Sequence, residues 1–143
     1  MSTKFYCILA IVLFSFVQVR NTASITNYKS PLIAEYVEHC LRESRANPEH
    51  IIFLKNGVIH SPNYALKNWL LCYLSRTGVM SPEGVLKQHV VMKKVAKQDK
   101  DLVEKIIDKC LFKTPHEPVD TAWKYLTCFR KRQPQYAREI NHI

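Results

Sequence analysis

Four cysteines, Cys40, Cys72, Cys110 and Cys128, are the residues of this chain whose chemistry is easiest to predict. They are separated by 31, 37 and 17 residues, and each lies in a segment with the apolar spacing of an amphipathic helix. An even number of cysteines in a short secreted chain is typical of a disulfide scaffold. Four cysteines allow three pairings, and the sequence alone does not choose among them. We therefore expect two disulfides that join helices.

Motifs for catalysis and for metal binding are absent from the sequence. It has no HExxH, no Gly-rich phosphate loop and no Gly-x-Ser-x-Gly elbow, so we predict no enzyme activity and no catalytic residues. Cysteines and histidines never occur at C-x2-C or H-x3-H spacing, so we expect no metal site and no cofactor. Among the six histidines, His89 lies in a mostly apolar segment and is the candidate for pH-controlled ligand release.

The first residues predict a secretory signal peptide. Lys4 supplies a positive start, residues 5–17 are apolar except for one serine, and small residues occupy positions 22–24. The apolar run is shorter than the roughly 20 residues that a membrane span needs. We predict a leader of residues 1–24, which takes the fifth cysteine with it, and a mature domain of residues 25–143. The protein is then secreted and extracellular, where disulfides persist.

The mature chain is basic without the pattern of a nucleic-acid-binding protein. Residues 25–143 hold 19 Lys and Arg against 12 Asp and Glu, a net charge of +7 with neutral histidines. Lysines between positions 93 and 109 alternate with acids, which is the pattern of a solvated helix face. The one tight basic cluster, 130–132, falls at the expected end of the last helix, where cations complement the helix dipole. We expect no nucleic-acid partner.

Proline positions predict where the helices begin. Ser or Asn directly before Pro suits the N-cap and the first position of a helix. This pair occurs four times, at Ser30-Pro31, Asn47-Pro48, Ser61-Pro62 and Ser81-Pro82. These starts predict helices at 31–45, 48–56, 62–77 and 82–96.

Glycines and apolar spacing complete the predicted fold. Gly57 and Gly78 are expected to end the second and third helices as left-handed caps. Apolar residues at helical spacing predict two more helices, at 98–113 and 119–131. The tail, 135–143, would either cover an opening or fray. The predicted fold class is all-α, a single compact domain of about six helices around an apolar cavity, with two inter-helix disulfides.

The whole mature chain resembles the insect odorant-binding proteins of the pheromone- and general-odorant-binding family, in the form that lacks one cysteine pair. The six-cysteine pattern of that family has three residues between its second and third cysteines, which puts Asn68 at the vacant second position. Eight residues separate the fifth and sixth, which puts Val119 at the vacant fifth position. The stretch 119–129 is similar to the family's last helix. The basic charge is a departure, because many family members are acidic.

The resemblance implies that Cys40 pairs with Cys72 and Cys110 with Cys128. It implies a secreted carrier that binds a small hydrophobic ligand, such as an odorant or a pheromone, in an internal helical cavity and solubilises or transports it. It also implies a role in olfaction and delivery to a chemosensory membrane receptor.

The candidate ligand-binding residues are the inward stripes of the predicted helices, with His89 added for its possible titration. They are Ile33, Tyr36, Val37, Leu66, Leu70, Tyr73, Leu74, Leu86, His89, Val90, Met92, Ile106, Trp123, Leu126 and Phe129. Within this set, Tyr36 and Tyr73 are the candidates for a hydrogen bond to the ligand, since a buried phenol needs a partner.

A second interpretation is that the apolar stripes pack into a solid core. The protein would then be a secreted helical interaction or membrane-surface protein, cytokine-like, whose basic surface meets a receptor or anionic lipid. Under the carrier interpretation, the missing bridge between positions 68 and 119 leaves the third and sixth helices held by packing alone. We would then expect a more mobile cavity than in relatives with six cysteines.

Overall fold

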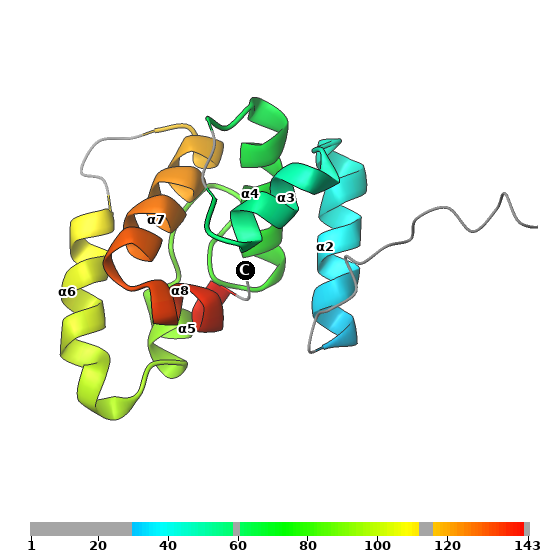
Figure 1. Cartoon of the computed structure of the whole chain (residues 1–143). Helices are drawn as coiled ribbons and strands as arrows, with labels where there is room; N and C mark the ends of the chain where they lie inside the picture. Colours follow the sequence, from blue (N-terminus) through cyan, green and yellow to red (C-terminus); the bar gives the residue numbers. More distant parts are fainter. Residues whose placement is uncertain (1–29, 59–60, 112–115, 142–143) are drawn as a thin grey trace, which may run out of the picture.

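The computed structural model describes residues 30–58, 61–111 and 116–141, and it is built from helices (Figure 1). In chain order these are α2 (Pro31–Ser44), α3 (Pro48–Lys55), α4 (Tyr64–Arg76), α5 (Gln88–Lys93), the short 3-10 helix η1 (Lys97–Asp99), α6 (Lys100–Cys110), α7 (Pro118–Arg132) and α8 (Pro134–Asn141). The predicted all-α class is confirmed: within the described ranges the one β-type contact is an isolated bridge between Met80 and Leu86. The predicted leader lies outside the described residues.

Two central helices, α4 and α7, pack against each other and carry most of the core (Figure 1). α2 packs on α4, while α6 and α8 pack on α7. Leu70, Tyr73 and Leu74 of α4 and Leu126 and Phe129 of α7 are all fully buried. The order α2, α4, α7, α6 therefore forms one continuous packed layer, with α5 joined to it through α6.

Two disulfides reinforce this packing. Cys40 of α2 is bonded to Cys72 of α4, and Cys110 of α6 is bonded to Cys128 of α7. The pairing implied by the family resemblance is thus confirmed. The bridges span 32 and 18 residues of sequence, for which the chain-entropy treatment gives a stabilisation of about 3 to 4 kcal/mol each.

The predicted ends of α3 and α4 are confirmed by their caps. The side chain of Asn47 accepts a hydrogen bond from the Glu49 amide at 2.9 Å at the start of α3. Gly57 and Gly78 adopt φ angles of 83° and 77°, and the amides that follow them bond back into the preceding helices. Both glycines sit where only a residue without Cβ is unstrained.

Two other predicted helix starts differ in detail. α4 begins at Tyr64 and not at Pro62, because the Asn63 side chain accepts from the Leu66 amide at 2.8 Å and supplies the N-cap. α2 does begin at Pro31, but the Ser30 side chain makes no capping bond. Ser30 thus occupies the N-cap position of α2 without a capping bond, whereas at α4 the N-cap is Asn63 and not Ser61.

The prediction of one helix over 82–96 is wrong. Ser81-Pro82-Glu83-Gly84 forms a reverse turn in which the Gly84 amide donates to the Ser81 carbonyl at 2.9 Å. Ser at the first position, Pro at the second and Gly at the fourth is the preferred sequence of a type I turn. Gly84 has a φ of 81°, and a Cβ there would lie 2.9 Å from the Cα of Pro118. Only the short helix α5 follows, so the helical register assumed for residues 82–96 does not exist.

The described part of the tail is helical. α8 packs on α7, and within it Tyr136 and Ala137 are buried. The Tyr136 hydroxyl donates to the Asp99 carboxylate of η1. The tail is therefore anchored as far as residue 137.

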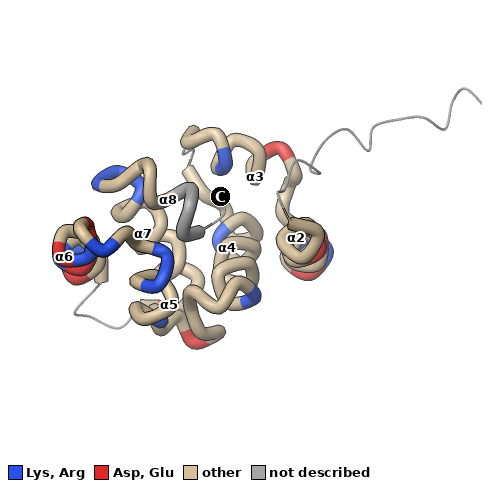
Figure 2. Tube along the Cα trace, turned by 90° about the horizontal axis from the view of Figure 1, so that it is seen from below, with Lys and Arg blue, Asp and Glu red and all other residues tan. Residues whose placement is uncertain are grey.

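The charged residues of α6 lie on the outside, as the sequence predicts for a solvated face. On α6, Lys100, Asp101, Glu104 and Lys105 are exposed, and Figure 2 shows both signs of charge mixed on this helix. None of the described helices is long and apolar enough to cross a membrane.

Candidate ligand-binding site

Thirteen of the fifteen candidate residues come together in one apolar cluster. The buried members are Val37, Leu66, Leu70, Tyr73, Leu74, Ile106, Trp123, Leu126 and Phe129, and the partly buried ones are Ile33, Tyr36, Leu86 and Met92. Two candidates stay outside the cluster: Val90 is partly buried and His89 is exposed on α5. His89 does not face the interior because the predicted helical register of its segment is wrong.

A small pocket lies at the edge of this cluster, between α3, α4 and α7. Leu66 and Trp123, both predicted, line it together with five residues that sequence reasoning missed: His50, Phe53, Leu54, Val58 and Ser61. Its volume is about 40 Å³, close to the share of one water molecule. The missed residues belong to α3 and the following loop, where the i, i+3 spacing of Ile51 and Leu54 in a short apolar run was the one weak signal in the sequence.

α3 covers this pocket and is held by a side chain from α7. The guanidinium of Arg130, which is only 8 % exposed, donates to the Leu54 carbonyl and, at 3.4 Å, to the Lys55 carbonyl. These carbonyls end α3, where the helix dipole is negative and a cation is stabilised. The sequence suggested that Arg130 complements the dipole of its own helix. The structure shows that Arg130 instead hydrogen-bonds the C-terminal end of α3, a helix that has few direct contacts with the other helices.

An ion pair joins α4 to α7 beside Asn68 and Val119, the positions that the family resemblance assigns to a missing cysteine pair. Lys67 Nζ lies 2.7 Å from Asp120 Oδ1, and these residues are the direct neighbours of Asn68 and Val119. The hydrogen bond from Lys67 holds the pKa of the Asp120 carboxyl below its ordinary value. The expectation that packing alone holds these two helices is therefore wrong.

Two tyrosines of the cluster, Tyr73 and Tyr125, are buried with their rings stacked on a neighbouring aromatic side chain. Tyr73 is fully buried and its ring stacks on Trp69, with ring centroids 5.2 Å apart. Tyr125 is also fully buried and stacks on Phe129 at 5.7 Å, but its hydroxyl has no hydrogen-bond partner among the described residues. Burial raises the pKa of the Tyr125 phenol above its ordinary value. Sequence reasoning missed Tyr125, although its i, i+4 spacing to Phe129 places both on one side of α7.

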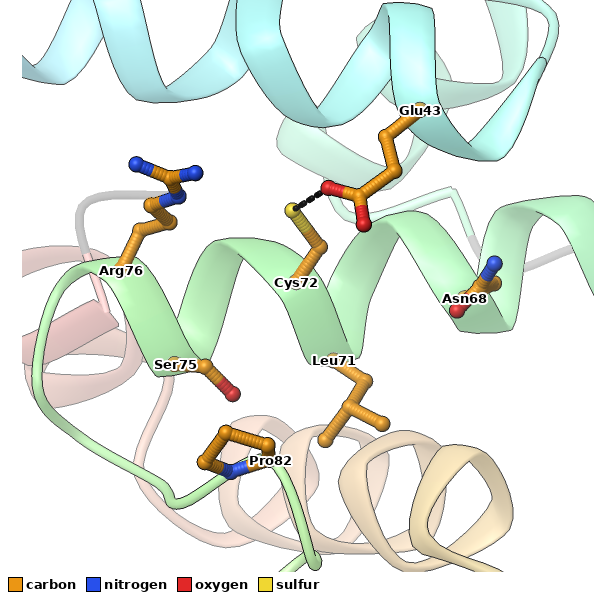
Figure 3. Close-up of a pocket in the computed structure, with 7 residues that line it drawn as sticks. All are labelled: Glu43, Asn68, Leu71, Cys72, Ser75, Arg76 and Pro82. Carbon is orange, nitrogen blue, oxygen red and sulfur yellow. Dashed lines mark hydrogen bonds between the residues drawn. The ribbon is translucent and has the colours of Figure 1, made fainter.

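A larger groove runs along the outer face of α4, between α2 and the turn at Pro82 (Figure 3). Its volume is about 410 Å³, and its lining residues are Glu43, Asn68, Leu71, Cys72, Ser75, Arg76 and Pro82. It contains none of the predicted ligand contacts. Charged side chains of Glu43 and Arg76 stand at its rim, and both are exposed, so water solvates this groove.

His39, Glu43 and Cys72 approach one another at this groove without forming a metal site. Their donor atoms lie within 4.8 Å of each other, but the Cys72 sulfur is bonded to Cys40 and offers no thiolate. The Glu43 carboxylate oxygen is 3.5 Å from that sulfur, which carries no hydrogen to donate. His39 Nε2 is 3.2 Å from Glu43 Oε2 and 2.5 Å from an Arg76 nitrogen, so the cluster pairs internally.

Comparison with known proteins gives the class of this chain. Residues 23–132 match the model of the PBP/GOBP family. The chain belongs to this family. It is also 27% identical over 128 residues to odorant-binding protein 10 of the mosquito Aedes aegypti, an alignment that covers 88% of this chain and 90% of the mosquito protein. No solved structure matches it closely.

Membership of the PBP/GOBP family supports a small-ligand carrier role for this chain, as the family resemblance implied. The family consists of binding proteins and not of enzymes, which agrees with the lack of catalytic motifs in the sequence.

Proposed function

We propose that this protein is secreted and carries a small hydrophobic ligand, such as an odorant, a pheromone or a similar semiochemical, inside its helical domain. One observation carries the proposal: candidate side chains from α2, α4, α6 and α7 converge in a single apolar cluster that ends in the pocket beneath α3. Such a ligand would be solubilised by burial of its apolar surface, with no chemical step. Delivery to a chemosensory membrane receptor is part of the same proposal.

The energetics of this binding follow from apolar burial. A ligand of about ten to fifteen carbon atoms covers roughly 300 Å² of apolar surface, and at about 25 cal/mol per Å² this supplies about 7 kcal/mol. A gain of about 7 kcal/mol corresponds to a Kd of about 10 μM, and association costs weaken the binding further. Burial of the ligand's own surface therefore predicts an affinity weaker than micromolar.

Access to the cluster requires α3 to move. A pocket of about 40 Å³ is several times smaller than a site for a molecule of this size. Of the helices around the pocket, α3 is the one joined to the rest by few contacts and no disulfide. We infer that the ligand enters beneath α3 and displaces Phe53 and Leu54, the α3 side chains that line the pocket.

The two tryptophans provide the test, because Trp123 lines the pocket and Trp69 does not. The variants Trp69→Phe and Trp123→Phe each leave one fluorophore. We expect a hydrophobic ligand such as decanol to change the Trp123 emission saturably in Trp69→Phe, and to change the Trp69 emission less in Trp123→Phe. Equal responses, or none, would contradict the site beneath α3.

Native mass spectrometry of the protein secreted by cells that express the full chain tests the remaining parts. We expect the mass of residues 25–143 less four hydrogens, with a small apolar adduct that is lost on denaturation. An empty protein that a panel of volatiles and fatty alcohols does not load, but that binds anionic vesicles in a salt-sensitive way, would instead favour the membrane-surface interpretation.

A further inference from the structure

The hydroxyl group of Tyr125 is an exception to the hydrogen bonding of the core. Tyr125 lies in the middle of α7 and is fully buried, and its hydroxyl oxygen has no partner among the described residues. Buried hydroxyl groups are nearly always hydrogen-bonded, because leaving one unpaired forfeits the bonds that it makes to water. An unpaired phenol in a packed interior therefore points to a partner that binds there.

Two other buried aromatic residues, Trp69 and Tyr136, have partners for their polar atoms. The Tyr136 hydroxyl donates to Asp99, and Trp69 Nε1 donates to the Val37 carbonyl at 3.4 Å. One further buried atom in the described ranges lacks a partner, Ser75 Oγ, which lies at the solvated outer groove. Tyr125 is thus the unpaired hydroxyl of the apolar interior.

The surroundings of Tyr125 suit the apolar body of a ligand. Its ring stacks on Phe129, and it is followed on α7 by Leu126, both of which belong to the predicted ligand-binding set. A site that encloses a small molecule in apolar side chains fixes its orientation with a few polar groups. Tyr125 provides such a group in the apolar cluster, although it does not line the pocket beneath α3, so a ligand that enters there has to extend into the cluster to reach its hydroxyl.

We propose that the Tyr125 hydroxyl hydrogen-bonds the oxygen atom of the carried ligand, so that this protein selects neutral oxygenated molecules, such as alcohols, aldehydes and esters, over hydrocarbons of the same length. This proposal rests on the carrier function proposed above. Tyr125 is a specificity-determining residue in it, and the apolar cluster supplies the affinity common to all ligands.

The chemistry of the phenol limits the ligand class further. Burial keeps the phenol protonated, because its pKa is raised above the ordinary value, so it donates to a carbonyl or alcohol oxygen. An alcohol can also donate in return. A carboxylate would bring a negative charge into an apolar cluster, where desolvation opposes it.

The test compares three ligands of equal chain length, decanol, decanal and decane, by displacement of a hydrophobic fluorescent probe from wild type and from Tyr125→Phe. We expect the variant to bind decanol and decanal about 2- to 12-fold more weakly and decane equally well, the range for one net hydrogen bond. Tyr136→Phe is the matched control: it removes a hydroxyl from another buried tyrosine that lies outside the predicted ligand-binding set and already pairs with Asp99, so the same selective loss is not expected.

The outcomes separate the two proposals. If decane displaces the probe and Tyr125→Phe shifts all three ligands equally or not at all, the role of Tyr125 is overturned and the carrier function stands. If none of the three displaces the probe from wild type, both fall. A second readout needs no variant: in protein labelled with ¹³C at the tyrosine Cζ, the Tyr125 resonance should shift with decanol and stay unchanged with decane, and equal shifts would overturn the proposal.

Discussion

Replacement of Arg130 by methionine should loosen α3 selectively. The guanidinium donates to the carbonyls of Leu54 and Lys55 at the negative end of α3, and methionine fills similar space without a donor. The Leu54 carbonyl still accepts from the Gly57 amide at 3.1 Å, so it is not left unpaired. One hydrogen bond from a charged donor is worth about 1.5 to 3 kcal/mol, and relief of the buried charge offsets part of it. We therefore expect the opening of α3 to become about 2 kcal/mol easier.

Native-state hydrogen exchange measures this directly. A change of 2 kcal/mol corresponds to about 30-fold faster exchange of the amides that open with α3, in residues 51–55. The central helices α4 and α7 should keep most of their protection. Arg132→Met is the control, because Arg132 is exposed two residues further along the same helix. Equal exchange of residues 51–55 in the two variants, or a uniform loss of protection over all helices, would refute the assignment of Arg130 to α3.

Two further predictions concern the α4–α7 contact and the turn that was mistaken for a helix. Because the folded pKa of Asp120 lies below the unfolded value, its pair with Lys67 stabilises the fold above about pH 4 and ceases to do so as the pH falls through the folded pKa. The difference in melting temperature between wild type and Asp120→Asn should accordingly be present at pH 6 and disappear in acid, and a difference that grows in acid would contradict the pairing. Gly84→Ala should lower the free energy of unfolding, measured with denaturant, by about 3 kcal/mol, because it combines a positive φ with a clash against Pro118. Gly57→Ala also has a positive φ but lies in open space, so it should lower the free energy by about 1 kcal/mol. Equal losses in the two variants would refute the clash.

Most of the fold could be predicted from the sequence because the helix boundaries depend on residues that are close together in the chain. Asn47 with Pro48 and the two capping glycines act within a few residues, so α3 and the end of α4 could be located without knowledge of the tertiary structure. The same local signal failed at Ser81-Pro82, since a serine before a proline begins a type I turn as readily as a helix. Gly84, three residues after Ser81, is the residue that distinguishes the turn from a helix there.

The candidate site was predicted only in part, because apolar spacing along a helix predicts which residues are buried but not which residues of other helices they contact. Leu66 and Trp123 were found from their spacing, but the residues that complete their pocket come from α3, whose short apolar pattern gave little reason to choose it. The contact of Arg130 with Leu54 joins positions 76 residues apart, and no local pattern encodes it. The unpaired state of the Tyr125 hydroxyl likewise depends on every neighbour around it.

The covalent connectivity of the domain divides it in two. One disulfide closes α2 onto α4 and the other closes α6 onto α7, so each half is a separately stapled hairpin-like unit. The seam between the halves, α4 against α7, is the largest helix contact together with α2 on α4, and it is crossed by an ion pair in place of a covalent bond. The contact between the halves therefore depends on packing and this ion pair and not on the oxidation state of the cysteines, while loss of either bridge releases a helix within its own half.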